Sequence, residues 1–272
     1  MANVQQEVTF KTQGRIAIIT LNIPKKLNAM TQDHYYRVAM LLHEIAARDD
    51  IVITILTGNG RFFSAGADVS ISRDTPQNED TKRHFLKSFV ANNLHTTHAF
   101  YTHPKILITA LNGPAVGLSA ALTAFSDFIY AAPHAFLLTP FTSLGLVAEG
   151  GASRAFVQRL GISKANEALI MSKRLTCDEL TQVGYVNKVF DVKPGESDKF
   201  LELVLAEVED RLGLHLNQES LVKVKALIRK PEIDTLDKMG VAEVFGGLER
   251  FVKGIPQEEF RKIGSGEKKH KL

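Results

Sequence analysis

The chain has 272 residues, 44% of them apolar and 23% charged, and this composition excludes a disordered or low-complexity protein and allows one or two globular domains. Its net charge of +3 is too small and too scattered to indicate a nucleic-acid-binding surface. A single cysteine, Cys177, excludes an internal disulfide and a cysteine-rich metal cluster, and it is compatible with a reducing compartment.

Neither end of the chain nor its most apolar stretch predicts a membrane or secretory segment. The first twelve residues contain no apolar signal core. The stretch 106–132 is interrupted by Asn112, Pro114 and Asp127, whereas a membrane span needs about 20 mostly apolar residues. We therefore expect a soluble protein without a membrane span.

The amino-terminal part of the chain alternates between strand and helix patterns. Apolar and polar residues alternate in 7–11 and 15–22, with Gln13-Gly14 between them, which predicts a hairpin. Helical spacing predicts a helix over 31–47 with Thr31 as its N-cap. The remaining predictions here are a buried parallel strand at 51–57, loops at 61–70 and 73–81, and a helix at 81–97.

The rest of the chain continues this alternation up to Pro194 and then becomes helical and rich in charge. We therefore expect an α/β core over 1–194 and an all-helical region over 195–272. Parallel strands alternating with helices place ligands at the carboxyl ends of the strands. The predicted strands are 106–111, 128–131, 135–139 and 186–192, and the predicted helices are 118–125, 152–160, 164–171, 177–183, 196–230 and 241–264.

Several chemical motifs are incomplete. A dinucleotide fingerprint that starts at Gly58 and Gly60 has Phe63 where its third glycine should stand. Ser119 follows Gly117-Leu118, but Ala121 stands where the second glycine of a hydrolase nucleophile elbow is required. Three nearby histidines have no acidic partner at metal-ligand spacing, which favours a polar helix end over a metal site: His95, His98 and His103.

Two turns rich in small residues, 61–68 and 112–121, each follow a predicted strand. Small side chains let a ligand approach the peptide N–H groups closely. The second turn also opens a helix, whose first N–H groups have no intrahelical partner. The two turns could each direct one N–H at a single oxygen and form an oxyanion hole, or they could simply be tight packing.

Four segments resemble one family in order and spacing over residues 7–190. R-F-F-S-A-G-A-D at 61–68 and N-G-P-A-V-G-L-S-A-A at 112–121 resemble the oxyanion-hole segments of the crotonase (enoyl-CoA hydratase/isomerase) superfamily. The P-x-x-x-N-A element of that family resembles 24–29, and its C-D-I-x-Y-A strand resembles 126–131. The resemblance implies a crotonase-type ββα spiral core. Within the family, the pattern is most similar to the fungal peroxisomal Δ3,Δ2-enoyl-CoA isomerases.

The resemblance implies an acyl-CoA ligand and no metal or redox cofactor. The backbone N–H groups of Ala67 and Leu118 would hold the thioester oxygen, where enolate charge collects after a proton leaves C2. Other implied contacts to the substrate are Ala65, Gly66, Asp68 and Val69. Weaker candidates for the CoA phosphates are Lys25, Phe260 and Lys262, and some family members have a lysine where Ser70 stands.

The acids expected from the resemblance distinguish the possible reactions. Family hydratases carry glutamates at the positions of Ala121 and Phe141, and both are missing. Glu149 stands where the isomerases carry their catalytic acid. Asn93 is placed like a polar residue near that acid in the fungal isomerases, and it could bond Glu149 or a water, or be only a polar residue at a helix end. We therefore expect one glutamate to move a proton from C2 to C4 of a 3-enoyl-CoA, giving 2-trans-enoyl-CoA in the β-oxidation of unsaturated fatty acids.

Three alternatives stay open. The first is a Δ3,5-Δ2,4-dienoyl-CoA isomerase, although such enzymes usually pair the acid with a second one at the position of Phe141. The others are a weak hydratase and a non-catalytic acyl-CoA-binding paralogue. The resemblance also implies that the C-terminal helices build a homotrimer or homohexamer.

The last three residues, His270-Lys271-Leu272, resemble the S-K-L address for the peroxisome, with basic residues before them. This predicts a location in the peroxisomal matrix and an import receptor as partner. The basic end itself is too short to predict nucleic-acid binding.

Overall fold

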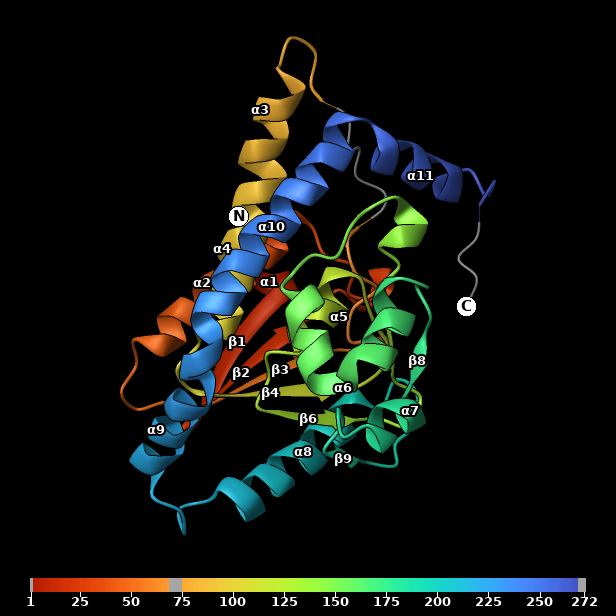
Figure 1. Ribbon diagram of the computed structural model, residues 1–272. Helices are drawn as coiled ribbons and strands as arrows, with labels where there is room; N and C mark the ends of the chain where they lie inside the picture. The colour runs from red at the N-terminus through yellow and green to blue at the C-terminus, as the bar shows by residue number, and fades with distance from the viewer. Residues whose placement is uncertain (1, 69–74, 269–272) are drawn as a thin grey trace.

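The computed structural model describes residues 2–68 and 75–268, and a six-stranded sheet lies at its centre (Figure 1). The predicted hairpin is confirmed, because the first two strands pair antiparallel while every other pair in this sheet is parallel. In sheet order the strands are β1 (Val8–Gln13), β2 (Ile16–Leu21), β3 (Ile53–Gly58), β4 (Ile106–Leu111), β6 (Phe128–Ala131) and β9 (Lys188–Val189).

A second, three-stranded sheet joins β5 (Ala115–Val116), β7 (Phe136–Leu138) and β8 (Leu175–Thr176). The sequence predicted only β7, because a two-residue strand is too short to show alternation. β9 was likewise predicted too long, at 186–192. The second turn, 112–121, follows the carboxyl end of β4, and β5 within it pairs in parallel with β7.

One face of the large sheet is covered by helices that the sequence placed well. The helix α2 (Gln32–Ala46) begins at the predicted cap, where the Thr31 side chain accepts from the His34 N–H. Ile19, Leu21 and Leu56 point from the sheet into the core on this side. The other helices of this layer are α4 (Ala91–Tyr101), α5 (Leu118–Thr123) and α6 (Ala152–Leu169), with α7 (Cys177–Gln182) beside them.

The opposite face of the sheet is covered by α8 (Ser197–Leu212), which lies along its lower side in Figure 1. Phe200 and Val204 of this helix pack against Ile18 and Ile55, residues that alternate with those facing the first core. The helix therefore completes the core of the preceding α/β region. The domain division at residue 194 stays a prediction.

Several helix boundaries were predicted wrongly. The region 231–240 is helical, since α10 begins at Ile233, and positive-φ Gly254 ends the helix that was predicted to run over 241–264. Residues 213–217 interrupt the predicted helix 196–230, and a short first helix was missed. The elements concerned are α1 (Ala2–Glu7), α9 (Gln218–Arg229), η4 (Lys230–Glu232), α10 (Ile233–Val252) and α11 (Ile255–Gly264).

Two irregular places in helices matter for the site. Gly161, with φ 74° and ψ 160°, divides α6 near the gap predicted between two helices. The predicted helix 81–97 is α3 (Thr81–Phe85) continued by a π-type turn, η2 (Leu86–Val90), and then by α4. Such π turns are frequent at functional sites. Within the described part of the chain, no helix is long and apolar enough to cross a membrane.

Candidate active site

Asn28, within the segment 24–29, holds the first of the two turns of small residues, 61–68. Its side chain is fully buried, and its Oδ1 accepts from the Ile23 N–H at 2.8 Å. Its Nδ2 donates to the carbonyl oxygens of Asn59 at 2.9 Å and Phe62 at 2.8 Å. One amide therefore ties together two loops that are far apart in sequence, and it holds Asn28 at a φ of 55°.

The backbone beyond Asn28 pairs with the turn and leaves one amide unused. Met30 N–H donates to Gly66 O at 2.8 Å, and Asp68 N–H donates to Met30 O at 2.9 Å. These bonds flank Ala67, whose own N–H must then point away from Met30. Among the described residues the Ala67 N–H has no acceptor, which is the arrangement needed for one half of an oxyanion hole.

The second turn lies against the first and offers a similar amide. Val116 N–H donates to Ser64 O at 2.9 Å, and Gly117, at a φ of 62°, donates to Leu138 O at 2.8 Å. Leu118 follows as the first residue of α5, so its N–H has no intrahelical acceptor. No acceptor for it is found in the part of the chain that the structure describes.

The two unused amides lie at corresponding places in the paired turns. Ser64 and Ala115 form a parallel bridge, and Ala67 and Leu118 each stand three residues beyond it. The turns approach closely there, because a Cβ atom on Gly66 would lie only 2.8 Å from the carbonyl oxygen of Val116. The oxyanion-hole role of the two amides stays a prediction.

Glu149 is held by a polar pair on α4. Its Oε2 accepts from Asn93 Nδ2 at 2.9 Å, so the predicted contact between these two residues is confirmed. The Thr97 hydroxyl donates to Asn93 Oδ1 at 3.3 Å. Because only the amide oxygen can accept from that hydroxyl, the NH₂ group is turned toward the carboxylate. Asn93 and Thr97 are buried, and Glu149 is half-buried.

The segment that carries Glu149 packs on the second turn. A Cβ atom on Gly150, the next residue, would lie 2.6 Å from Leu118 Cδ1 and 3.2 Å from Ala121 Cβ. Burial raises the pKa of the nearby Tyr35 hydroxyl, and the negative charge of Glu149 raises it further. The backbone just after Glu149 therefore lies against the side chain of Leu118, the residue that carries the second unused amide.

A second carboxylate, Glu243 of α10, was missed by sequence reasoning. It is 6% exposed, and it accepts from Gly151 N–H at 2.7 Å and from Ser153 N–H at 2.8 Å. Burial raises its pKa. Glu243 lies at the N-terminal end of α6, where the helix dipole favours a negative charge. Its two hydrogen bonds hold the segment just after Glu149. The only sequence signal was an acid on a helix face that otherwise carries apolar residues.

Both positions at which family hydratases carry an acid are apolar and enclosed. Phe141 is 1% exposed, Ala121 is fully buried, and both belong to the main core. Within the described residues, no three His, Cys, Asp or Glu side chains gather closely enough to hold a metal ion. The segment of Glu149 packs on the second turn, and the second turn pairs with the first, so the predicted catalytic roles of Glu149, Ala67 and Leu118 stay predictions about one region of the fold.

The remaining substrate-binding predictions are only partly described. Ala65, Gly66 and Ala67 lie in the first turn, where Asp68 is buried and bonds Lys26 Nζ at 2.8 Å. Lys262 on α11 is paired with Glu259 at 3.0 Å. Roles in CoA binding stay predictions for these residues, for exposed Lys25 and for half-buried Phe260. Val69, Ser70 and His270-Lys271-Leu272 lie outside the described residues.

Comparison with known proteins defines the family. A model of the enoyl-CoA hydratase/isomerase family matches residues 11–203, so the chain belongs to that family. It is 58% identical to a "Delta(3,5)-Delta(2,4)-dienoyl-CoA isomerase" of Pyricularia oryzae, over 97% of this chain and 98% of that one. It is 35% identical to the "3,2-trans-enoyl-CoA isomerase" of Saccharomyces cerevisiae, over 98% and 97% of the two chains.

A solved structure supports the same fold. An enoyl-CoA hydratase/isomerase from Mycobacterium paratuberculosis superposes with a TM-score of 0.82 at 23% identity, covering 94% of this chain and 98% of the other. The predicted crotonase-type α/β fold with a C-terminal helical region is therefore confirmed. The subgroup expected from the sequence, the Δ3,Δ2-enoyl-CoA isomerases, is represented by a relative less similar than the dienoyl-CoA isomerase.

Proposed function

We propose that the protein is an acyl-CoA double-bond isomerase, and that its preferred reaction converts 3,5-dienoyl-CoA to 2,4-dienoyl-CoA. The observation that carries the isomerase chemistry is one carboxylate, Glu149, held by Asn93 next to turns in which two peptide N–H groups have no acceptor among the described residues. Hydration would need a positioned water and a further acid or base. The family's two positions for hydratase acids are occupied by Ala121 and Phe141.

The proposed reaction moves one proton and one set of π electrons. The Glu149 carboxylate removes a proton from C2, and the electrons of that C–H bond form an enolate whose charge rests on the thioester oxygen. The N–H groups of Ala67 and Leu118 stabilise this oxygen, each contributing about 3 kcal/mol in known oxyanion holes. When the carbonyl re-forms, the double bonds shift, and the carboxylic acid of Glu149 gives its proton to the far end of the conjugated system, which restores the carboxylate.

The choice of substrate rests on the relatives. In a 3,5-dienoyl-CoA the enolate charge spreads to C6, so the same two amides serve that reaction as serve a simple 3-enoyl-CoA. The relative that is 58% identical over nearly its whole length carries the dienoyl name. This favours the dienoyl alternative over the Δ3,Δ2 reaction expected from the sequence.

Isomerisation of 3-enoyl-CoA to 2-trans-enoyl-CoA is the second candidate, and Phe141 favours it. The usual dienoyl-CoA isomerases resemble this chain but pair the acid with a second acid at that position. Here the position holds a phenyl ring that is 1% exposed. A single carboxylate can move a proton from C2 to C4 more easily than from C2 to C6, because C2 and C4 lie closer together.

Product analysis of the purified protein on three substrates tests the proposal. We expect the largest kcat/KM with 3,5-dienoyl-CoA, lower turnover of 3-enoyl-CoA, and little hydration of 2-enoyl-CoA. A higher kcat/KM for 3-enoyl-CoA would replace the main proposal by the second candidate. Dominant hydration would contradict both, and binding of acyl-CoA without turnover would favour a non-catalytic paralogue.

Asn93→Ala should lower kcat about tenfold, because the base then loses the hydrogen bond that orients it. The variant should leave KM within about twofold, since Asn93 bonds Glu149 through one end and Thr97 through the other. Steady-state kinetics would measure both constants. Asn92→Ala is the matched control, because within the described residues the Asn92 side chain bonds the Ser88 carbonyl of the preceding turn η2 and not Glu149. Equal losses in the two variants would contradict the orienting role.

Location and assembly remain proposals of the same kind. We infer import into the peroxisome through His270-Lys271-Leu272, and a fluorescent fusion lacking these residues should stay in the cytosol. We also infer a homotrimer or homohexamer. Light scattering would measure the mass of the assembly. Exposed apolar side chains on α9 and α10 support its formation: Val224, Leu227, Ile228, Val241 and Phe245.

A further inference from the structure

Three buried hydroxyl groups form a chain beneath the two turns. Tyr35 Oη lies 2.8 Å from Ser119 Oγ, and Ser119 Oγ lies 2.9 Å from Ser64 Oγ. Ser64 Oγ in turn lies 2.8 Å from the carbonyl oxygen of Asn28. All four residues are buried, with exposed fractions between 0% and 6%.

The acceptor at the end gives the chain one direction. A carbonyl oxygen only accepts, so the single Ser64 hydroxyl proton goes to Asn28. Ser64 must then accept from Ser119, and Ser119 must accept from Tyr35. Ser64 Oγ also accepts from the Gly66 N–H at 3.1 Å. The donors are therefore aligned from α2 through both turns, an arrangement in which each bond strengthens the next.

The chain touches each turn next to the amide proposed for the oxyanion hole. Ser119 directly follows Leu118, and the Ser64 hydroxyl holds Gly66, which directly precedes Ala67. The bond between Ser119 and Ser64 is thus a side-chain bridge from one turn to the other. Tyr35 reaches this bridge from a different element, α2, and supplies its first donor.

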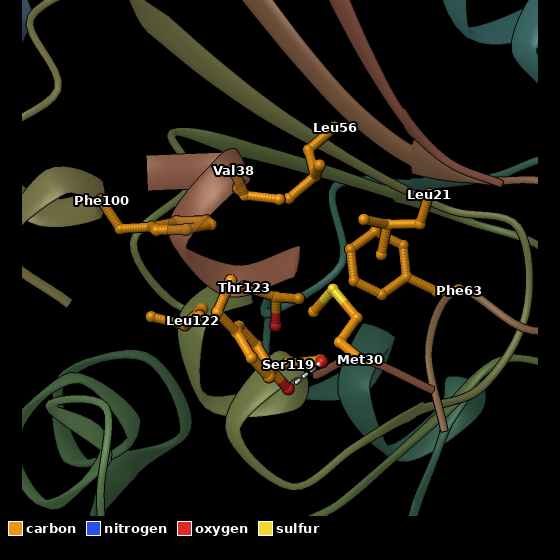
Figure 2. Close-up of a pocket in the computed structure, with 10 residues that line it drawn as sticks. Leu21, Met30, Val38, Leu56, Phe63, Phe100, Ser119, Leu122 and Thr123 are labelled. Carbon is orange, nitrogen blue, oxygen red and sulfur yellow. Dashed lines mark hydrogen bonds between the residues drawn. The ribbon is translucent and has the colours of Figure 1, made fainter. Parts of the chain in front are cut away.

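The surroundings of the tyrosine hydroxyl are closely packed and apolar. Figure 2 shows Ser119 at the edge of a small cavity, with Met30, Phe63 and Leu122 around it and a dashed line for its bond to Tyr35. The cavity has a volume of about 10 Å³, the room of one water and far too little for an acyl chain. Loss of the hydroxyl would therefore not be repaired by a rearranged substrate contact.

We infer that Tyr35 is a positioning residue for the oxyanion hole: through Ser119 and Ser64 it holds the Ala67 and Leu118 amides at the separation that one thioester oxygen requires. This inference rests on the proposed function, since it deepens the same site. Tyr35 does not touch the reacting atoms in this account. Its effect passes through the two serines to the carbonyl of the bound substrate.

The chain offers a matched control in a second buried tyrosine whose hydroxyl bonds α5. Tyr185 is also fully buried, and its hydroxyl lies 2.8 Å from Thr123 Oγ1, one turn further along α5 than Ser119. Burial raises the pKa of Tyr185 to about 12. Tyr185→Phe therefore removes a buried tyrosine–hydroxyl bond to α5 without touching either turn.

The experiment compares Tyr35→Phe with Tyr185→Phe, with Ser119→Ala as a second test of the bridge. Each variant is assayed for kcat and KM on the preferred enoyl-CoA or dienoyl-CoA. The ultraviolet absorption of bound 2,4-dienoyl-CoA is also measured, because polarisation of its carbonyl shifts the band to longer wavelength. Thermal unfolding reports the structural cost of each change.

We expect Tyr35→Phe to lower kcat about tenfold and to shrink the red shift, while KM stays within about twofold. Ser119→Ala should do the same, and Tyr185→Phe should lose similar thermal stability with kcat and red shift kept. If wild type turns over and shifts the band but Tyr35→Phe behaves like Tyr185→Phe, the inference is wrong and the proposed function stands. If the wild-type protein neither turns over the substrate nor shifts the band, the inference and the proposed function are both wrong.

Discussion

Glu149→Gln is expected to lower isomerase turnover at least about a thousandfold, because an amide cannot accept the C2 proton. The fold should be kept, since a glutamine oxygen can still accept from Asn93 Nδ2 at the 2.9 Å position of the carboxylate oxygen. Turnover of 3,5-dienoyl-CoA and 3-enoyl-CoA would measure the effect. Binding of a saturated acyl-CoA, which cannot react, should be within about threefold of wild type.

Two further variants serve as an intermediate case and as a control for this prediction. Glu149→Asp keeps the charge but withdraws it from Asn93, so we expect activity between those of wild type and Glu149→Gln. Glu207→Gln changes a glutamate of α8 that pairs with Lys188. Because α8 covers the face of the sheet opposite α4 and α5, this variant should leave turnover unchanged. Turnover by Glu149→Gln above about a tenth of wild type would rule out the single-base mechanism.

Gly66→Ala should lower kcat about a hundredfold, because the change pushes the two turns apart. Gly66 has a φ of +86°, and its added methyl would meet the Val116 carbonyl oxygen at 2.8 Å. That carbonyl belongs to backbone and cannot swing aside. The Ala67 N–H, one residue further on, would then miss the position that the thioester oxygen occupies. Steady-state kinetics and the red shift of bound dienoyl-CoA would show the loss.

Gly14→Ala separates this effect from the cost of a positive φ alone. Gly14, in the β1–β2 turn, has a φ of +56° and nothing within 4 Å of an added Cβ. Alanine at such a φ costs about 1 kcal/mol of stability, so both variants should unfold more easily. Only Gly66→Ala should lose turnover. Normal kcat in a folded Gly66→Ala protein would argue against the paired-turn oxyanion hole.

Local patterns predicted much of the fold because the responsible forces act within a few residues. The Thr31 cap, the hairpin and β4 follow from hydrogen bonds and apolar spacing that neighbours along the chain impose. Two-residue strands such as β5 and β8 left no pattern, because their pairing depends on partners elsewhere. The start of α10 at Ile233 was missed for the same reason, since this helix is stabilised by packing against α3, η2 and α4.

Some residues of the candidate site could also be predicted from the sequence, and others could not. Residue types and spacing pointed to Glu149, Asn93 and both turns, and the contact between Glu149 and Asn93 is present. The role of Glu243 could not be seen in the sequence, because it depends on two peptide N–H groups at the start of α6, those of Gly151 and Ser153. The hydroxyl of Tyr35 shows no pattern along the chain, because its partners are serines in two segments far from it in sequence.

The sequence by itself determined the family, the two turns of small residues and the absence of acids at the hydratase positions, because each of these is a matter of which residue stands where. Only the tertiary structure decided which amides stay unused. An N–H group is unused or paired according to the strands and turns beside it, and those neighbours of Ala67 and Leu118 come from segments far apart in the chain.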